Sequence, residues 1–263
     1  MISALIGHSG FIGSNIKRQR AFDEYFDAAE VDQIAGRSFD LVVCSGPRLA
    51  KWQANADPTI DRDNIEHVVG ALERANIRKL VVISTIEVFQ NPVDVDEDSP
   101  VPTAGLHAYG RNRRWLEQIA SSRFDALVVR LPSLYGPGLS KNVLFDLMTD
   151  NAVSSIDSRA TYQFYDIGRL SRDIDRAVDA ELEVIHLPTE PVSVADLARE
   201  ALGVEFTNEI AATPARHDVH TRHAELLGGN GVYLQSKTRE LEAIRAFAEA
   251  TAREEPDDGS PGR

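Results

Sequence analysis

Three glycines within residues 7–13 have the types and spacing to bind a phosphate. Gly7, Gly10 and Gly13 follow an apolar run over residues 2–6 and precede a segment with helical character. In a strand–turn–helix of this kind, the first glycine permits a tight turn, the second lets the backbone approach a pyrophosphate, and the third lets the helix pack on the strand. The free N–H groups and dipole of the helix favour the anion. The turn is therefore predicted to bind phosphates; the alternative is a helix start whose glycines serve packing alone.

An acidic residue at the end of the second strand usually holds the adenosine ribose hydroxyls beside such a turn. Asp27 is the best candidate, although it lies closer to Gly13 than is usual because the intervening helix is short. If Asp27 holds the ribose, NAD is favoured over NADP as the cofactor. The alternative is an ordinary loop aspartate.

Further polar side chains stand where other strands and helices begin or end. Residues 83–89 close a buried strand and include Thr85 and Glu87. A helix begins at Tyr109, and the four-residue spacing puts Tyr109 and Arg113 on one face of it. Glu87 either contacts a substrate or is a polar residue at a strand end, and Tyr109 alone could be a half-buried helix aromatic.

Together these segments resemble the extended short-chain dehydrogenase/reductase family, in its NAD-dependent epimerase/dehydratase branch that acts on nucleotide sugars. The resemblance covers residues 1–138 and includes the small pair Ser45-Gly46 and the strand exit Arg-Leu-Pro-Ser-Leu-Tyr-Gly-Pro-Gly over 130–138. It implies binding of NAD or NADP by Gly7, Gly10, Phe11, Ile12, Gly13, Asp27, Ser45, Gly46, Tyr109, Arg113, Pro132 and Leu134.

The resemblance also implies a catalytic set of Thr85, Tyr109, Arg113 and Glu87. In that family a Ser or Thr orients the substrate oxygen and a tyrosine is the general acid or base. A lysine lowers the pKa of the tyrosine and binds the nicotinamide ribose. Here Arg113 takes the lysine position; arginine supplies a charge but is planar and cannot shuttle a proton. In the dehydratases an acid–glutamate pair follows the threonine, whereas here Ile86 replaces the acid and Glu87 keeps the glutamate.

Apolar runs alternate with helical segments through the first half of the chain. Strands are predicted over 2–6, 24–26, 40–44, 79–84 and 126–131, and helices over 14–20, 58–75 and 109–121. This alternation predicts an α/β fold with a Rossmann-type doubly wound parallel sheet. We expect an NAD(P)-binding Rossmann domain over 1–138, a small mixed α/β substrate lobe over 139–250, and a disordered tail over 251–263.

Composition limits the class of partner. Apolar residues make up 43% of the 263 residues, the net charge is -13 and the pI is about 5.0, which argues against nucleic acid. No apolar run is long enough to cross a membrane. Cys44 lies in an apolar run and is expected to be an inert core thiol, which fits the cytoplasm.

Two further groups of side chains are weaker candidates. His217, His220 and His223 are interpreted as a solvated polar segment rather than a metal site, and no metal is expected. Three arginines of the later lobe either bind a diphosphate or form surface ion pairs; they are Arg159, Arg169 and Arg172.

The sequence therefore predicts an NAD(P)-dependent, epimerase-like oxidoreductase that acts on a nucleotide sugar or related carbohydrate by hydride transfer, with Tyr109 as general acid or base. The alternative is a catalytically impaired NAD(P)-binding sensor or regulatory protein, which Arg113 and Ile86 motivate. The resemblance further implies a homodimer formed through the helices over 58–75 and 109–121.

Overall fold

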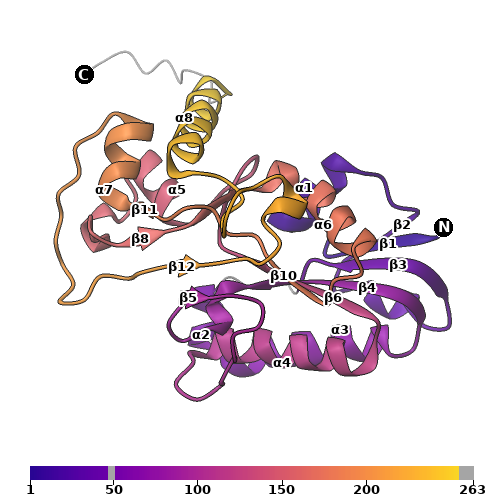
Figure 1. Ribbon diagram of the computed structural model, residues 1–263. Helices are drawn as coiled ribbons and strands as arrows, with labels where there is room; N and C mark the ends of the chain where they lie inside the picture. Colours follow the sequence, from indigo (N-terminus) through magenta and orange to yellow (C-terminus); the bar gives the residue numbers. More distant parts are fainter. Residues whose placement is uncertain (47–50, 255–263) are drawn as a thin grey trace, which may run out of the picture.

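A parallel sheet forms the centre of the molecule (Figure 1). The computed structural model describes residues 1–46 and 51–254, and within them six strands pair in the order β10-β6-β4-β3-β1-β2, each pair parallel. The predicted Rossmann-type parallel sheet is therefore confirmed. Its strands are β1 (Ser3–Ile6), β2 (Glu24–Phe26), β3 (Ser38–Cys44), β4 (Asn76–Thr85), β6 (Ala126–Leu131) and β10 (Val184–His186).

Helices cover both faces of this sheet. The helices α1 (Phe11–Gln19) and α6 (Leu170–Asp179) lie on one face, and α3 (Pro58–Leu72) and α4 (Ala108–Arg123) lie on the other (Figure 1). Successive side chains of a strand point to opposite faces. Val43 therefore packs in the core beneath α1 and α6, and Val42 in the core beneath α3 and α4. Cys44 is buried in the second core, and burial raises the pKa of its thiol, as expected for an inert core residue.

The order of the strands reverses at β1. From β1 the chain moves outward to β2 and then crosses back to β3 on the other side of β1. The connection from β2 to β3 contains the short 3₁₀ helix η1 (Val31–Ile34). In open parallel sheets, ligands bind beyond the carboxyl ends of the strands at such a reversal. Here Gly7 follows β1 and Ser45 follows β3 at that edge.

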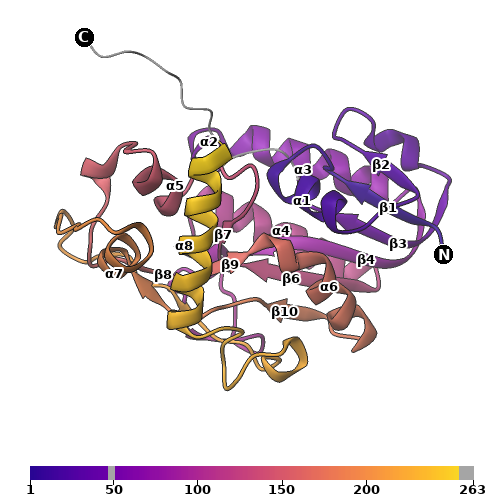
Figure 2. The ribbon, with the colours of Figure 1, turned by 90° about the horizontal axis from the view of Figure 1, so that it is seen from above.

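A second, smaller group of elements lies at one end of the sheet (Figure 2). It has its own core, in which Tyr135, Leu144, Phe164 and Ile244 are buried together. Its elements are β7 (Ser133–Tyr135), α5 (Val143–Met148), η3 (Val153–Ser155), β8 (Thr161–Tyr162), β9 (Phe164–Asp166), β11 (Val192–Ser193), α7 (Val194–Asp196), the π-helix η5 (Leu197–Leu202) and α8 (Lys237–Glu254). We call this group the lobe.

The chain crosses between sheet and lobe more often than the sequence predicted. The strand β7 precedes residue 138 but pairs with β9 in the lobe, whereas β10 lies within 139–250 but is the edge strand of the central sheet. The predicted division at residue 138 therefore does not coincide with the division between sheet and lobe. The helix α8 also includes residues 251–254, which were assigned to a disordered tail; residues 255–263 lie outside the described residues.

A buried ion pair joins α4 to three strands. Glu117 on α4 is 1% exposed and accepts hydrogen bonds from Nε (3.0 Å) and Nη2 (2.8 Å) of Arg130 on β6 and from the Ser84 hydroxyl on β4 (2.6 Å). Nη1 of Arg130 lies 3.1 Å from Nε2 of His186 on β10. Burial lowers the pKa of His186 to about 4, so the neutral ring accepts from Arg130 and donates from Nδ1 to the His220 carbonyl (3.0 Å).

Glu240, in the first turn of α8, generates a prediction about pH. Burial raises the pKa of its carboxyl to about 8, from a usual value of 4.5. Because the folded-state pKa is raised, the stability associated with the neutral carboxyl is fully present below about pH 4.5 and is lost as the pH rises through about 8. We expect Glu240→Gln to lose less unfolding free energy than the wild type over this range, measured by urea denaturation at several pH values.

The exposed residue Glu249 on the same helix supplies the control, because its carboxylate forms only a surface ion pair with Arg253. Glu249→Gln should follow the pH dependence of the wild type. If Glu240→Gln did so too, a raised pKa at Glu240 would be ruled out.

Candidate cofactor and substrate site

The glycine turn packs so closely that side chains would not fit at two of its positions. A Cβ atom built at Gly13 would lie 2.1 Å from the carbonyl oxygen of Gly7, so α1 rests directly on the turn. Gly7 itself has a φ of +79°, and a Cβ there would lie 2.5 Å from the hydroxyl of Ser45. Gly7 therefore permits the tight turn and Gly13 lets α1 pack directly on it, the roles predicted for the first and third glycines.

Hydrogen bonds tie this turn to the neighbouring strand and to a facing loop. The Ser45 hydroxyl is placed to bond to the carbonyl oxygens of Ile6 (2.9 Å) and Gly7 (3.1 Å), which fixes the end of β3 against the turn. From α1, the Asn15 amide donates to the carbonyl of Pro137 (2.9 Å). The segment after β7 is thereby held over the start of α1. Of the other sequence-predicted cofactor residues, Phe11 and Ile12 begin α1, Gly46 follows Ser45, Pro132 lies between β6 and β7, and Leu134 lies on β7. Their contact with a cofactor stays a prediction.

Asp27 lies against the glycine turn directly after β2. Its carboxylate accepts from the backbone N–H of Ser9 (3.3 Å) and from the Ser9 hydroxyl, and it lies 3.6 Å from Nε2 of His8. The structure therefore brings Asp27 to the turn, as the sequence predicted for a ribose ligand. There its carboxylate is already engaged by the turn itself.

The turn after β4 and the start of α4 are in direct contact. Thr85 caps the 3₁₀ helix η2 (Ile86–Val88), and its Oγ1 accepts the N–H of Glu87 (3.2 Å). A Cβ built at Gly110 would lie 2.4 Å from the carbonyl oxygen of Glu87, so the first turn of α4 presses against η2. Thr85 and Tyr109 are therefore carried on two segments that touch. Tyr109 is half-buried, with its backbone N–H bonded to Oδ1 of Asn55 (3.0 Å).

Arg113 lies beside Tyr109 but is paired with another residue. Its guanidinium carbon lies 4.5 Å from the centre of the Tyr109 ring. Its two Nη atoms lie 3.1 and 3.4 Å from the two carboxylate oxygens of Asp61 on α3, and both side chains are almost fully buried. Asp61 also accepts from the Asn112 amide (2.9 Å). Asp61 could not be predicted as a site residue from the sequence, because its partners lie more than fifty positions away.

Glu87 is the centre of a charged cluster that the sequence did not predict as a whole. Nζ of Lys51, on α2 (Lys51–Ala56), lies 2.7 Å from one carboxylate oxygen, and Nε2 of His107 lies 2.9 Å from the other. Nδ1 of His107 accepts the N–H of Gly110 (3.0 Å), so Nε2 carries the proton and donates to Glu87. Burial opposes ionisation of Glu87, but Lys51 and His107 outweigh it, and its pKa lies below the usual range.

A cavity of about 310 Å³ opens beside this cluster and is lined by Glu87, His107 and His217. Burial lowers the pKa of His217, and its Nδ1 is buried with no hydrogen-bond partner among the described residues. The ring of Tyr162 meets His217 edge-on, with the ring centres 5.0 Å apart. The lobe therefore contributes Tyr162 and His217 to the surroundings of Glu87, and no sequence motif had singled them out for this place.

The three histidines do not form one cluster. They span the extended strand β12 (Asp218–Val219), which pairs with β5 (Val93–Val95), so their spacing does not create a helix face. His220 contacts Tyr233 and Asp218, whereas His217 faces Glu87. The expected solvated polar segment is therefore wrong for His217, which the lobe encloses.

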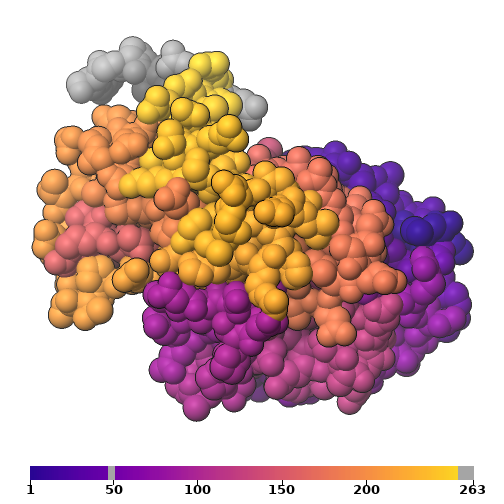
Figure 3. Space-filling model, in the orientation of Figure 1, coloured from indigo at the N-terminus to yellow at the C-terminus, as the bar shows by residue number. Residues whose placement is uncertain are grey.

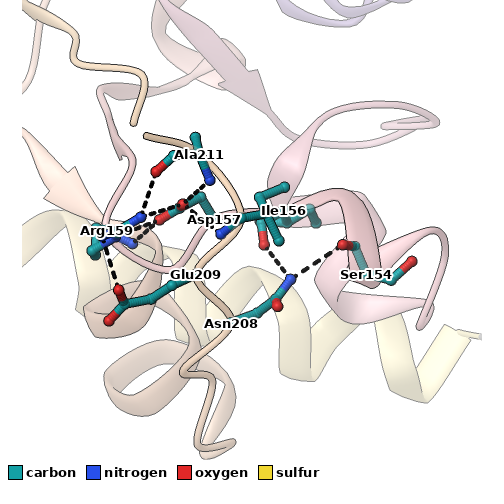
Figure 4. Close-up of polar contacts among 8 residues, drawn as sticks. Ser154, Ile156, Asp157, Arg159, Asn208, Glu209 and Ala211 are labelled. Carbon is teal, nitrogen blue, oxygen red and sulfur yellow. Dashed lines mark hydrogen bonds and ion pairs between the residues drawn. The ribbon is translucent and has the colours of Figure 1, made fainter. Parts of the chain in front are cut away.

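Arg159 is neutralised within the lobe (Figure 4). Its Nε and Nη2 lie 3.0 and 2.9 Å from the Asp157 carboxylate, and its Nη1 lies 2.8 Å from Glu209. Asp157 also accepts the backbone N–H of Ala211 (2.9 Å), which ties the loop after η5 to this turn. Arg159 therefore forms ion pairs within the lobe. Arg169 directly precedes α6, and Arg172 lies on it.

Comparison with protein-family models and with curated proteins finds no match for this sequence. Its fold is shared with solved structures. One is UDP-N-acetylglucosamine 4-epimerase from Methanobrevibacter ruminantium M1 in complex with UDP-N-acetylmuramic acid, with a TM-score of 0.75 and 13% identity over 96% of this chain and 98% of that chain. A second is the Bordetella bronchiseptica enzyme WbmH in complex with NAD+, with a TM-score of 0.73 and 19% identity over 97% of this chain and 99% of that chain. A third is a double mutant of DesIV, a dTDP-glucose 4,6-dehydratase from Streptomyces venezuelae, with NAD bound. Its TM-score is 0.74, with 14% identity over 97% of this chain and 98% of that chain. The chain therefore has the same Rossmann-type fold as these enzymes.

Among the helices of the described residues, none combines the length and the apolar character needed to cross a bilayer.

The buried pair of Asp61 and Arg113 generates a prediction about stability. Removing one partner leaves an uncompensated buried charge, which costs about 3–5 kcal/mol, whereas exposed ion pairs contribute about 0–1 kcal/mol. We expect Asp61→Leu to destabilise the protein by an amount in the first range, and Asp61→Leu combined with Arg113→Met to recover most of the loss. Urea denaturation measures both effects.

Asp32→Ala is the matched control, because Asp32 pairs with Arg74 at the surface. It should change the unfolding free energy little. A double variant as unstable as Asp61→Leu alone would show that the charge of Arg113 is not the cause.

Proposed function

We propose that this protein is an NAD(P)-dependent oxidoreductase of the epimerase type that acts on a nucleotide sugar or related carbohydrate. One arrangement carries the proposal: the glycine turn after β1 and the contacting pair of segments that hold Thr85 and Tyr109 stand at the same carboxyl edge of the sheet. The first supplies a place for a dinucleotide phosphate and the second a hydroxyl and a phenol for a substrate. The fold shared with enzymes solved with NAD or a UDP-sugar supports this proposal.

The crevice fits a dinucleotide in two respects. The close packing at Gly7 and Gly13 holds the turn directly on the N-terminus of α1, whose first N–H groups and dipole favour a phosphate there. The carboxylate of Asp27 stands beside the turn, where it would accept hydrogen bonds from ribose hydroxyls and repel a 2′-phosphate. This arrangement favours NAD over NADP. The cofactor, when bound, supplies the hydride acceptor or donor.

The roles of the two hydroxyl groups follow from their contacts. Thr85 Oγ1 accepts the Glu87 N–H, so its own O–H is left to donate to a substrate oxygen. Tyr109 would take the proton of a substrate hydroxyl as the sugar carbon is oxidised, and return it on reduction. Arg113, held by Asp61, fixes the ring of Tyr109 from its face and does not transfer protons.

Glu87 has a different character from Tyr109. With Lys51 and His107 on its two oxygens, the carboxylate is ionised at neutral pH and holds its proton poorly. It is suited to accept a hydrogen bond from a sugar hydroxyl at the cavity beside it, rather than to donate a proton to the substrate.

The second candidate function is a catalytically impaired NAD(P)-binding sensor. The pair of Arg113 and Asp61 favours it, because the cation that should stabilise a tyrosine phenolate and bind ribose is committed to a buried carboxylate. Under this alternative, cofactor binding persists without turnover.

The test compares binding with turnover. NADH and NADPH are titrated by fluorescence, and a panel of nucleotide sugars is assayed for oxidation and epimerisation. We expect Tyr109→Phe to lower turnover by about 10²–10⁴-fold, the range for loss of a general acid or base, while NADH affinity changes by less than about twofold.

Arg113→Lys separates the two candidates. A large gain of turnover in this variant would indicate a degraded enzyme, and tight NADH binding with no turnover in the wild type would favour the sensor. Failure of both NADH and NADPH to bind would overturn the proposal as a whole.

We also propose a cytoplasmic homodimer in which α3 and α4 of two copies pack together, as the family resemblance implies. Ile60 on α3 and Trp52 on α2 are large apolar side chains that are 51% and 64% exposed in the single chain. Light scattering at micromolar concentration should give twice the chain mass of 29.0 kDa, and Ile60→Asp should lower it. A wild-type mass of one chain would contradict the dimer.

A further inference from the structure

A second cavity lies on the outer side of α6, away from the glycine turn. Its volume is about 850 Å³, and its lining includes four arginines, of which Arg169, Arg172 and Arg176 line the α6 side and Arg239 comes from the first turn of α8. The wall opposite α6 is the segment over 227–236 that leads into α8. On the face shown in Figure 3, this segment, in orange to yellow, lies against the orange-pink surface of α6.

The charge of this cavity is opposite to that of the protein. The chain carries a net charge of -13, yet four arginines line this cavity, with Glu190 in the lining, Asp173 beneath it and Asp166 close enough to act on Arg172. Glu190 is already engaged, since its carboxylate accepts the backbone N–H of Lys237 (2.8 Å). The lining itself therefore sets four arginines against one carboxylate.

One buried carboxylate orients two of the arginines. Asp173 is 1% exposed and accepts from the hydroxyl of Tyr165 (2.8 Å) and from Nε of Arg172 (2.9 Å), and Nε of Arg169 lies 3.7 Å from it. Nη1 of Arg169 donates to the Gln235 side chain (3.1 Å). Arg172 is thus held through Nε by Asp173 and lines the cavity beside Arg169.

The other two arginines have no carboxylate partner within residues 1–46 and 51–254. Arg176 and Arg239 are exposed and form none of the ion pairs found there. These two guanidinium groups are therefore available to an anion that enters the cavity. Guanidinium groups bind phosphate oxygens through paired N–H donors, so a phosphate ligand matches this lining better than a single small anion would.

We propose that this cavity binds a di- or polyphosphate anion, at a site separate from the dinucleotide turn. The cavity has the size of a small-molecule site, which is about 300–1,000 Å³, and its lining shares no residue with the glycine turn, Asp27 or Ser45. The start of α6 is also braced on α1, because Gln19 donates to the Ile167 carbonyl (2.8 Å) and accepts the N–H of Ser171 (2.8 Å). A phosphate held by α6 would therefore rest on a wall that is already fixed.

The experiment measures inorganic pyrophosphate binding to the full chain by calorimetry. We compare the wild type with Arg176→Ala/Arg239→Ala, which removes the two unpaired arginines, and with Arg78→Ala/Arg253→Ala, which removes the same charge at exposed positions elsewhere. We expect the first double variant to bind at least tenfold more weakly and the control to match the wild type within about twofold.

Two further measurements distinguish this cavity from the dinucleotide turn and check that the variant folds. NADH affinity of Arg176→Ala/Arg239→Ala should equal that of the wild type, and circular dichroism should show an unchanged fold. Equal pyrophosphate binding by all three proteins, or no binding to the wild type at millimolar concentration, overturns the proposal. So does tighter binding of hexaglutamate than of pyrophosphate through the same arginines, since the ligand would then be an acidic peptide.

Discussion

The buried ion pair between Glu117 and Arg130 fixes the position of α4, and the candidate site depends on that position. Rotating or sliding α4 would leave both charges without a partner in a region without water, which costs several kcal/mol. Tyr109 lies about two helical turns before Glu117 on the same helix. The ion pair of Glu117 with Arg130 therefore also determines where the Tyr109 phenol lies. The close approach of Gly110 to the Glu87 carbonyl then sets Thr85 against the same helix.

The pair of Arg113 and Asp61 gives a physical reason for the arginine at a position where the resembling family has lysine. Asp61 presents both carboxylate oxygens, and the Tyr109 ring presents a flat face. A planar guanidinium satisfies both at once, whereas an ammonium group would satisfy one of them. The glycine turn thus keeps the residues predicted for a phosphate site, and the departure from the resembling family lies at the start of α4.

The sequence predicts elements well where burial is continuous. The strands β1, β3, β4 and β6 are apolar runs buried on both faces, and Asp57 caps α3 with Pro58 after it, as expected. It does not predict β10, which has only three residues, nor the charge-rich helix α8. Among the residues of the candidate site, the sequence predicts those that lie within motifs. It misses Asp61 and Lys51, because ion pairs across long sequence separations leave no local pattern. It names His217 but does not predict its place beside Glu87, which depends on how the chain folds back.

The repeated crossing of the chain between sheet and lobe restricts how the molecule can move and be divided. A protein with two sequential domains can close over a ligand by bending at one linker, and either half can be cut away. Here the edge strand β10 arrives only after β7, β8 and β9 have built part of the lobe. A fragment ending at residue 138 would expose the side of β6 that β10 covers, because sheet and lobe are joined at several points of the chain rather than by one linker.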